Sequence, residues 1–257
     1  MTDPDWSATS ADYARHRQSF PPRFHDLIAR EHLFAPGMRV LDIGTGTGAV
    51  ARALAARGGE VLGLDPAPGQ VAAARELAAR EGVAARFGEG LAERTGQPPA
   101  CFDLVVAAQC WHWFERGLAA AEAMRVLKPG GVLLICHHDW LPLPGSVAHA
   151  TEFLIEAHNP RWRMGRGTGF YPAWAADLAL AGFQGLGFAG FDHDALYPRA
   201  DWRGRIRASA GVGGALDGEA VARFDAELCA LLDARFPGDP LVVPHRVFAI
   251  WARKPQE

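Results

Sequence analysis

Short apolar runs alternate with alanine-rich stretches along the chain from Arg39 to Arg253. Each run is a few residues long and holds few polar positions, which is typical of a strand buried on both faces of a parallel sheet. The stretches between the runs have the composition of helices. Because strands that alternate with helices form a sheet covered by helices on both faces, the pattern predicts a doubly wound α/β fold.

The boundaries of these elements follow from the runs and from the residues that interrupt them. Predicted strands cover residues 38–43, 60–64, 84–87, 102–107 and 132–137, and two final strands cover 183–191 and 245–252. Predicted helices cover 48–57, 69–81, 116–127 and 173–181. The segment 127–131 reads LKPGG and predicts a helix end with a tight turn into the fifth strand, because proline cannot continue a helix and glycine accepts a positive φ.

Two stretches, 140–171 and 199–240, fall outside this alternation. The first is rich in Pro, Gly, Trp and Arg, and the second has helical patterns at 202–208 and 218–236. In α/β enzymes such insertions commonly supply the substrate pocket, so we expect both to form a lid over that pocket.

Composition and charge narrow the class of protein. Hydrophobic residues make up 49% of the chain and charged residues 21%, which excludes a largely disordered protein. The formal net charge of -3 provides no basic field for phosphates, so we expect neither a nucleic-acid partner nor an anionic membrane. The four cysteines show no C-x-x-C spacing, the first residues lack the plan of a signal peptide, and no apolar run approaches a membrane span. These features predict a cytoplasmic protein without a structural zinc.

A glycine-rich turn follows the first predicted strand. Residues 40–48 read VLDIGTGTG, so a strand runs directly into glycines and then into a helix. Glycine lets a ligand approach the backbone closely, and the helix start offers unpaired N–H groups, so the segment predicts a loop for a nucleotide-type ligand. Gly44–Ala49 also satisfies the G-x-G-x-x-G/A pattern of dinucleotide sites. The loop by itself leaves both classes of ligand open.

Three acidic residues in or after the predicted strands could each contact such a ligand. Asp42 lies inside an apolar strand, where its carboxylate needs a cationic or donor partner. S-adenosylmethionine offers an α-ammonium group there and a dinucleotide offers phosphate, so the charge favours S-adenosylmethionine, while capping of the loop amides is the structural alternative. Asp65 ends the second strand at the spacing that suits ribose hydroxyls in either ligand. Glu89 follows the third strand and is placed to meet the adenine amine.

In combination these segments resemble the class I S-adenosylmethionine-dependent methyltransferases. The resemblance covers about residues 10–137 and includes the glycine turn, Asp65, Gly88–Leu91 and the segment 125–131. The segments YARHR at 13–17 and QCWHWF at 109–114 are similar to the subgroup that includes trans-aconitate methyltransferase and its small-molecule relatives. This chain has Glu89-Gly90 where the family more often has Asp-Ala.

The resemblance implies a Rossmann-like seven-stranded sheet, mostly parallel with an antiparallel last strand. It implies one methyltransferase domain over 1–257, with an N-terminal helical cap at 1–36, a cofactor-binding core at 37–139 and the two insertions forming the acceptor pocket. It also implies a cofactor site in which different residues contact different parts of S-adenosylmethionine. The methionine end would be lined by Asp42, Gly44, Thr45, Gly46 and Gly48, the ribose by Asp65, the adenine by Glu89, Gly90 and Leu91, and the far side of the cofactor by Gln109, with Tyr13 and Arg17 closing over it.

The segment Gln109–Phe114 follows the fourth strand, at the carboxyl edge where open α/β sheets bind ligands. Methyl transfer needs alignment of nucleophile and methyl group, exclusion of water and, for an acidic nucleophile, removal of a proton. His112 is the first candidate base, with His137 and His138 as alternatives, and a pocket wall is the structural alternative for His112. Adjacent residues on a strand point to opposite faces, so His137 and His138 predict no metal site.

The acceptor pocket is expected to combine aromatic and cationic side chains from the loops and insertions. Tryptophans would bind a planar or apolar acceptor, and arginines would bind a carboxylate. The predicted pocket residues are Trp111, Trp113, Trp140, Trp162, Arg163 and Arg203. The predicted reaction is methyl transfer from S-adenosylmethionine to a small-molecule O, N or C nucleophile, releasing S-adenosylhomocysteine. The alternatives are an NAD-dependent oxidoreductase with the same glycine turn and an S-adenosylmethionine-binding protein with other chemistry.

Overall fold

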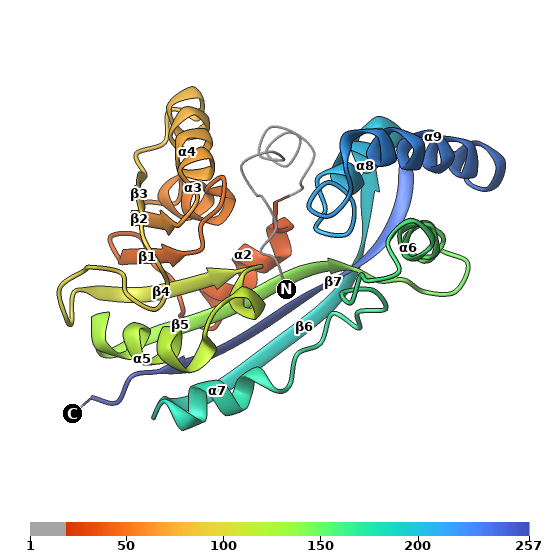
Figure 1. The fold of residues 1–257 in the computed structure, drawn as a ribbon. Helices are drawn as coiled ribbons and strands as arrows, with labels where there is room; N and C mark the ends of the chain where they lie inside the picture. Colours follow the sequence, from red (N-terminus) through yellow and green to blue (C-terminus); the bar gives the residue numbers. More distant parts are fainter. Residues whose placement is uncertain (1–18, 257) are drawn as a thin grey trace. The chain divides into compact units, whose positions relative to one another are not determined.

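The computed structural model describes residues 19–256, so Tyr13 and Arg17 lie outside the described part of the chain. The described residues form a seven-stranded sheet with the strand order β3-β2-β1-β4-β5-β7-β6 (Figure 1). The strands are β1 Arg39–Ile43, β2 Glu60–Asp65, β3 Arg86–Glu89, β4 Phe102–Ala108, β5 Leu127–Trp140, β6 Gln184–Tyr197 and β7 Leu241–Arg253. The predicted Rossmann-like sheet is confirmed.

The first five strands pair in parallel. β1 lies between β2 and β4, β3 pairs with β2, and β5 pairs with β4. The last strand, β7, is antiparallel to β5, as the bonds Gly130 N to Lys254 O and Leu141 N to Pro244 O show at the two ends of β5. The order of connections reverses between β1 and β4. Such a reversal opens a crevice at the carboxyl ends of the strands, which is where open α/β sheets bind ligands.

Helices fill the connections where the sequence predicts them. They are α2 Pro22–Arg30, α3 Ala49–Ala55, α4 Pro68–Glu81, the 3-10 helix η1 Trp111–Trp113, α5 Arg116–Val126, α6 Val147–His158, α7 Trp174–Leu180, α8 Arg199–Arg207 and α9 Gly218–Arg235. α4 begins with Pro68 and ends at Gly82, whose φ of 66° suits a helix C-terminus. α6 was not predicted, although Ser146 caps it by accepting a hydrogen bond from His149 N.

The predicted turn at 127–131 is wrong, because β5 already begins at Leu127. Leu127 pairs with Phe102 of β4, and the register then shifts before Leu104 pairs with Val132. Gly130 has a φ of 75° in this segment. The glycines therefore produce an irregularity inside a long strand rather than a turn before a short one.

The chain divides into two compact units. We call the first the core unit; it comprises Ser19–His138, Tyr171–Gly190 and the residues from Val247 onward. We call the second the insertion unit; it comprises Asp139–Phe170 and Phe191–Arg246. Both expected insertions fall in the insertion unit, except for Tyr171.

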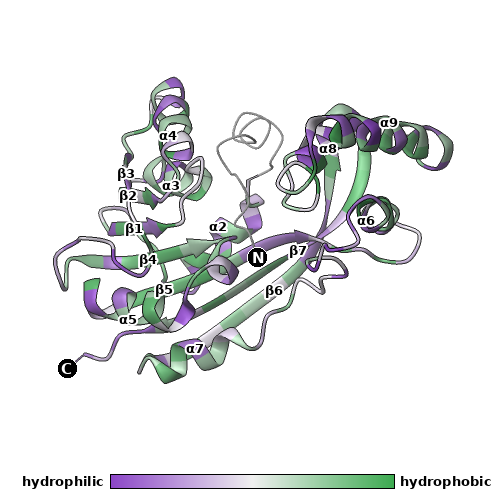
Figure 2. Ribbon diagram, in the orientation of Figure 1, coloured by the Kyte–Doolittle hydropathy of each residue, from purple (hydrophilic) through white to green (hydrophobic). Residues whose placement is uncertain are grey.

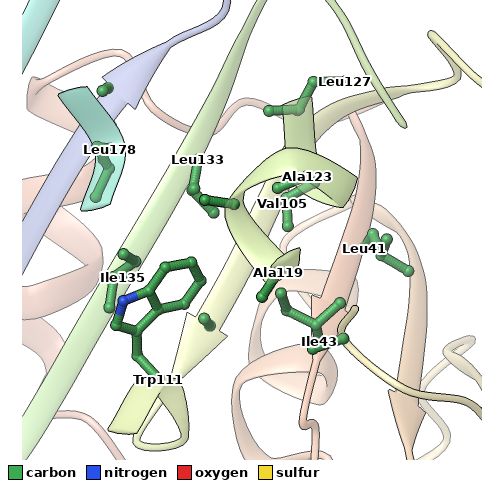
Figure 3. Packing of buried hydrophobic residues seen from close by; sticks show 14 of the residues in the cluster. Leu41, Ile43, Val105, Trp111, Ala119, Ala123, Leu127, Leu133, Ile135 and Leu178 are labelled. Atoms are coloured by element: carbon green, nitrogen blue, oxygen red, sulfur yellow. The ribbon is translucent and has the colours of Figure 1, made fainter. Parts of the chain in front are cut away.

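The core unit buries the apolar side chains that the strand pattern predicts. β4 and the middle of β5, residues 132–136, are largely hydrophobic, whereas the end of β5 is hydrophilic (Figure 2). Against them pack the alanine face of α5 and the buried residues of α7. Trp111 has no exposed surface and lies among Leu133, Ile135 and Ala119 (Figure 3). A tryptophan therefore fills the centre of this hydrophobic layer.

The insertion unit has a hydrophobic core of its own. Trp202 of α8 is fully buried and donates from Nε1 to Thr151 Oγ1 of α6 at 3.1 Å. Phe224 and Leu228 of α9 belong to the same buried cluster. This core explains the apolar faces of the helices that the second insertion contributes. Within residues 19–256, no helix is both long and apolar enough to cross a membrane.

Candidate cofactor site

The three glycines of the turn after β1 have different surroundings. Gly44, Gly46 and Gly48 all have positive φ, at 65°, 55° and 77°. A Cβ at Gly44 would lie 2.9 Å from atoms of Cys110, and a Cβ at Gly48 would lie 2.7 Å from the Phe87 ring. Among the described residues, a Cβ at Gly46 meets only the Gln70 Oε1 atom, at 3.9 Å. Packing therefore requires glycine at 44 and 48, whereas Gly46 faces space that a ligand can use.

Asp42 places a carboxylate beneath this turn. The side chain is 1% exposed, and its Oδ2 atom accepts a hydrogen bond from the Thr45 hydroxyl at 2.6 Å. Oδ1 is buried without a hydrogen-bond partner among the described residues. Burial raises the pKa of Asp42 to about 7, although the Thr45 hydroxyl and the Ala51 amide act in the opposite direction. A buried carboxylate with one oxygen available as an acceptor fits a cationic or donor group such as an α-ammonium group.

Asp65 connects the glycine turn to the start of α4. Its Oδ2 atom accepts from Gly46 N at 2.8 Å, and its Oδ1 atom accepts from Ala67 N at 3.0 Å. Burial raises the pKa of Asp65, and the two amide hydrogen bonds lower it in part. Each carboxylate oxygen retains acceptor capacity beyond one amide, so the arrangement also suits ribose hydroxyls.

Glu89 stands beside Asp65 at the ends of neighbouring strands. The two residues are paired in the parallel register of β2 and β3. Gly90 N donates to Asp65 O at 3.2 Å, and Leu91 is 47% exposed. The structure thus brings the predicted adenine residues, Glu89, Gly90 and Leu91, next to the predicted ribose residue.

Gln109 holds the end of β4 to the end of β5. Its backbone has a φ of 67°, which is uncommon for a residue other than glycine. Gln109 N donates to Cys136 O at 2.8 Å, and Gln109 Nε2 donates to His138 O at 2.8 Å. Such backbone conformations are frequent at functional sites, where surrounding bonds maintain them. Here two hydrogen bonds maintain it at the carboxyl edge of the sheet.

The three candidate bases lie in different surroundings. His112 is exposed, and its ring lies 4.8 Å from the Trp113 ring and 5.2 Å from the His137 ring. His137 is buried against Tyr171 and Trp174. His138 is buried on the opposite face of β5, where its ring lies 5.7 Å from that of Phe20. His112 and His137 are therefore neighbours, and His138 is separated from both.

Two predicted pocket residues have other roles. Trp111 is fully buried and donates from Nε1 to Asp177 Oδ2 at 3.0 Å, so it belongs to the core and not to a pocket wall. Arg203 binds Asp225 through two nitrogens, at 3.0 and 2.6 Å, so its donors already have a carboxylate partner. Trp111 is therefore a core residue, and the pocket role of Arg203 stays a prediction.

The other predicted pocket residues remain accessible to different degrees. Arg163 is exposed and Trp113 is half-buried against the hydrophobic cluster of the core unit. Trp162 is half-buried beside Gly211, where a Cβ would approach its Nε1 atom to 2.9 Å. Trp140 donates from Nε1 to Glu152 Oε1 at 2.7 Å. Glu152 is buried on α6 and was not singled out by the sequence analysis.

A family model described as "Methyltransferase domain" matches residues 41–135. This match covers the glycine turn, Asp65, Glu89 and Gln109, which are the residues that the geometry brings to the carboxyl edge of the sheet. Residues 41–135 are therefore a methyltransferase domain of the class I S-adenosylmethionine-dependent type. The predicted family and its cofactor are therefore confirmed, and the oxidoreductase alternative is set aside.

Two curated proteins are similar to this chain in sequence. An uncharacterised methyltransferase of Mycobacterium tuberculosis is 39% identical over 121 residues, which is 47% of this chain and 46% of the relative. A ubiquinone biosynthesis O-methyltransferase of Azorhizobium caulinodans is 29% identical over 175 residues, which is 65% of this chain and 66% of the relative. The chain thus spans about half the length of the first of these relatives.

Among solved structures, the [4+2]-cyclase SpnF is similar to this methyltransferase-family chain with a TM-score of 0.59 and 24% identity. The likeness covers 94% of this chain and 84% of the cyclase. At this identity the likeness shows the fold alone. It also shows that the fold of this family is found in an enzyme named for a different reaction.

Proposed function

We propose that this protein transfers the methyl group of S-adenosylmethionine to an O, N or C nucleophile of a small molecule and releases S-adenosylhomocysteine. The observation that carries the proposal is that one turn combines open space at Gly46 with a preceding buried carboxylate, Asp42, whose Oδ1 atom has no hydrogen-bond partner among the described residues. Family membership supports the cofactor, and the ubiquinone relative supports a small-molecule acceptor. Membership of the trans-aconitate subgroup, the absence of a nucleic-acid partner and a cytoplasmic location stay predictions.

The cofactor would be held by residues from four strand ends. We assign Asp42 to the α-ammonium group, Asp65 to the ribose, Glu89–Leu91 to the adenine and Gln109 to the far side. The charge of Asp42 suits this role because a buried carboxylate is stabilised by a neighbouring cation. Tyr13 and Arg17 keep their predicted place over the cofactor as part of the proposal.

S-adenosylmethionine, when bound, supplies an electrophilic methyl group. The contribution of the protein is to align the acceptor with that methyl group and to exclude water. Proton removal is needed only when the nucleophile is an acid, and His112 is the proposed base for that case. Its exposure and its place after β4 support access to an acceptor.

Asp65→Ala is expected to weaken binding of S-adenosylmethionine by about 1.5–3 kcal/mol, because charged hydrogen bonds to the ribose are lost. Titration calorimetry on the purified protein measures this change. Asp103→Ala is the matched control, since Asp103 also binds a backbone amide, that of Arg39, but lies at the start of β4. Equal affinities of the Asp65 variant and the wild type, with both folded, would refute the ribose role.

His112→Ala is expected to lower kcat by about a hundredfold or more while the cofactor affinity stays the same, because general-base catalysis is removed. Turnover is measured as S-adenosylhomocysteine released with an acceptor found in a screen. His138→Ala serves as the comparison because its ring lies on the other face of β5. An unchanged kcat for His112→Ala would assign His112 to the pocket wall.

The experiment that tests the proposed function follows two products together by mass spectrometry. The protein is incubated with S-adenosylmethionine and a panel of small phenols, amines and carboxylates. We expect S-adenosylhomocysteine and a methyl mass gain on one acceptor class. A product formed without any methyl gain, as in a cyclisation, would contradict methyl transfer.

A further inference from the structure

The insertion unit contains a pocket of about 530 Å³, which lies within the range of small-molecule sites. One face of α6 forms its first wall, with His149, Glu152, Phe153 and Glu156 at helical spacing. The remaining walls are the segments 141–143 and 166–168 and Arg246 of β7. None of these residues belongs to the predicted cofactor site.

Glu152 brings a buried carboxylate to this pocket. The residue is 4% exposed, Oε1 accepts from the Trp140 indole at 2.7 Å, and Oε2 accepts from Arg166 N at 2.6 Å. Both donors are neutral N–H groups. Among the described residues Glu152 forms no ion pair, although the side chains of His149 and Arg166 interact with its carboxylate electrostatically. The hydrogen bonds hold Glu152 in place without compensating its charge.

The two arginines of the pocket are already neutralised. Arg166 pairs with Glu156 at 2.9 Å, and Arg246 pairs with Asp192 at 2.6 Å. Together the two ion pairs contribute no net charge, so the two pairs and the carboxylate of Glu152 carry one excess negative charge when Asp192, which lies outside the lining, is counted with its partner Arg246. Burial raises the pKa of Glu152, and the Trp140 and Arg166 hydrogen bonds lower it in part. A bound cation would stabilise the ionised carboxylate further.

Apolar side chains adjoin this charge. Phe153 is 56% exposed and Leu143 is 48% exposed, although both line the pocket. Leu141 and Pro142 extend the same wall. Large apolar groups that stay exposed in a concave site mark a surface for a ligand, and an aromatic ring also attracts a cation.

We propose that this pocket binds a protonated organic amine that carries an apolar chain or ring. The ammonium group would lie against Glu152, where it supplies the missing positive charge. The apolar part would lie on Phe153 and Leu143. A neutral or anionic ligand of the same shape would leave the carboxylate uncompensated and would bind more weakly.

Titration calorimetry on the full chain tests the proposal with 2-phenylethylammonium as the probe. The comparison ligands are 2-phenylethanol and phenylacetate, which keep the ring and change the charge. We expect the ammonium compound to bind at least about tenfold more tightly than the alcohol, and the carboxylate not to bind measurably. Equal affinity for the ammonium compound and the alcohol would overturn the proposal.

Two substitutions assign the binding to this pocket. Glu152→Gln is expected to weaken binding of the ammonium probe by about tenfold or more, and Phe153→Ala by about fivefold. Phe153 is largely exposed, so its variant is expected to fold even if Glu152→Gln disturbs the Trp140 and Arg166 bonds. Glu219→Gln is the matched control, because Glu219 pairs with Arg223 on α9 and is absent from the pocket lining. Wild-type affinity in both pocket variants would show that the amine does not bind here.

Discussion

Gly46→Val is expected to weaken binding of S-adenosylmethionine at least about a hundredfold, while the protein remains folded. The physical reason is that a branched side chain would occupy the open space over the turn and would cover the N–H groups at the start of α3. Within residues 19–256 nothing obstructs the new side chain, because the nearest atom to its Cβ is Gln70 Oε1 at 3.9 Å. The loss is therefore a loss of ligand space, measured by titration calorimetry.

Backbone strain is the competing explanation for such a loss, and Gly82→Val controls for it. Gly82 has a φ of 66°, close to the 55° of Gly46, and no atom of the described residues lies within 4 Å of its Cβ position. Each variant is expected to lose about 1–2 kcal/mol of stability from a left-handed β-branched residue. Only the Gly46 variant should lose the cofactor. Wild-type cofactor affinity in a folded Gly46→Val protein would refute the assignment of the turn.

Trp111→Ala is expected to reduce the free energy of unfolding by about 3–5 kcal/mol, the range found when a large buried side chain is truncated. The indole lies within the packed layer formed by β5 and α5 (Figure 3). Its removal leaves a cavity and deprives Asp177 of the Nε1 donor at 3.0 Å. Urea denaturation followed by circular dichroism measures the change.

Trp113→Ala is the matched control, since Trp113 belongs to the same 3-10 helix but is only half-buried. Its truncation is expected to cost about 1 kcal/mol. The two possible roles of Trp111 predict different results. Loss of a core residue lowers stability, whereas loss of a pocket-wall residue alters ligand binding more than stability. Similar stability losses for the two tryptophan variants would mean that Trp111 does not hold the core together.

The parallel half of the fold was predictable because its information is local. The apolar runs of β1, β2 and β4 and the helices between them follow from the order of residues within one element. The glycine turn was predictable for the same reason, since the strand, the glycines and the helix start are consecutive. The separate roles of its glycines were not, because Cys110 and Phe87, which require Gly44 and Gly48, come from other elements.

Two errors show where local patterns mislead. Pro129 and Gly130 predict a turn, but pairing with β4 draws the whole segment 127–131 into β5. The α6 helix was missed although Ser146 provides a cap, because the surrounding glycines and prolines suggested an irregular insertion. Long-range pairing and burial decided both segments.

The sequence by itself determined the fold class, the position of the glycine turn and the family, because these depend on neighbouring residues and on strand ends that a parallel sheet brings to one edge. Only the tertiary structure decided which side chains are available for chemistry. Arg203 binds Asp225 from the following helix, and Glu152 accepts from two neutral donors without forming an ion pair among the described residues. The physical reason is that the charge balance of a buried group depends on partners far away in sequence, which no local pattern records.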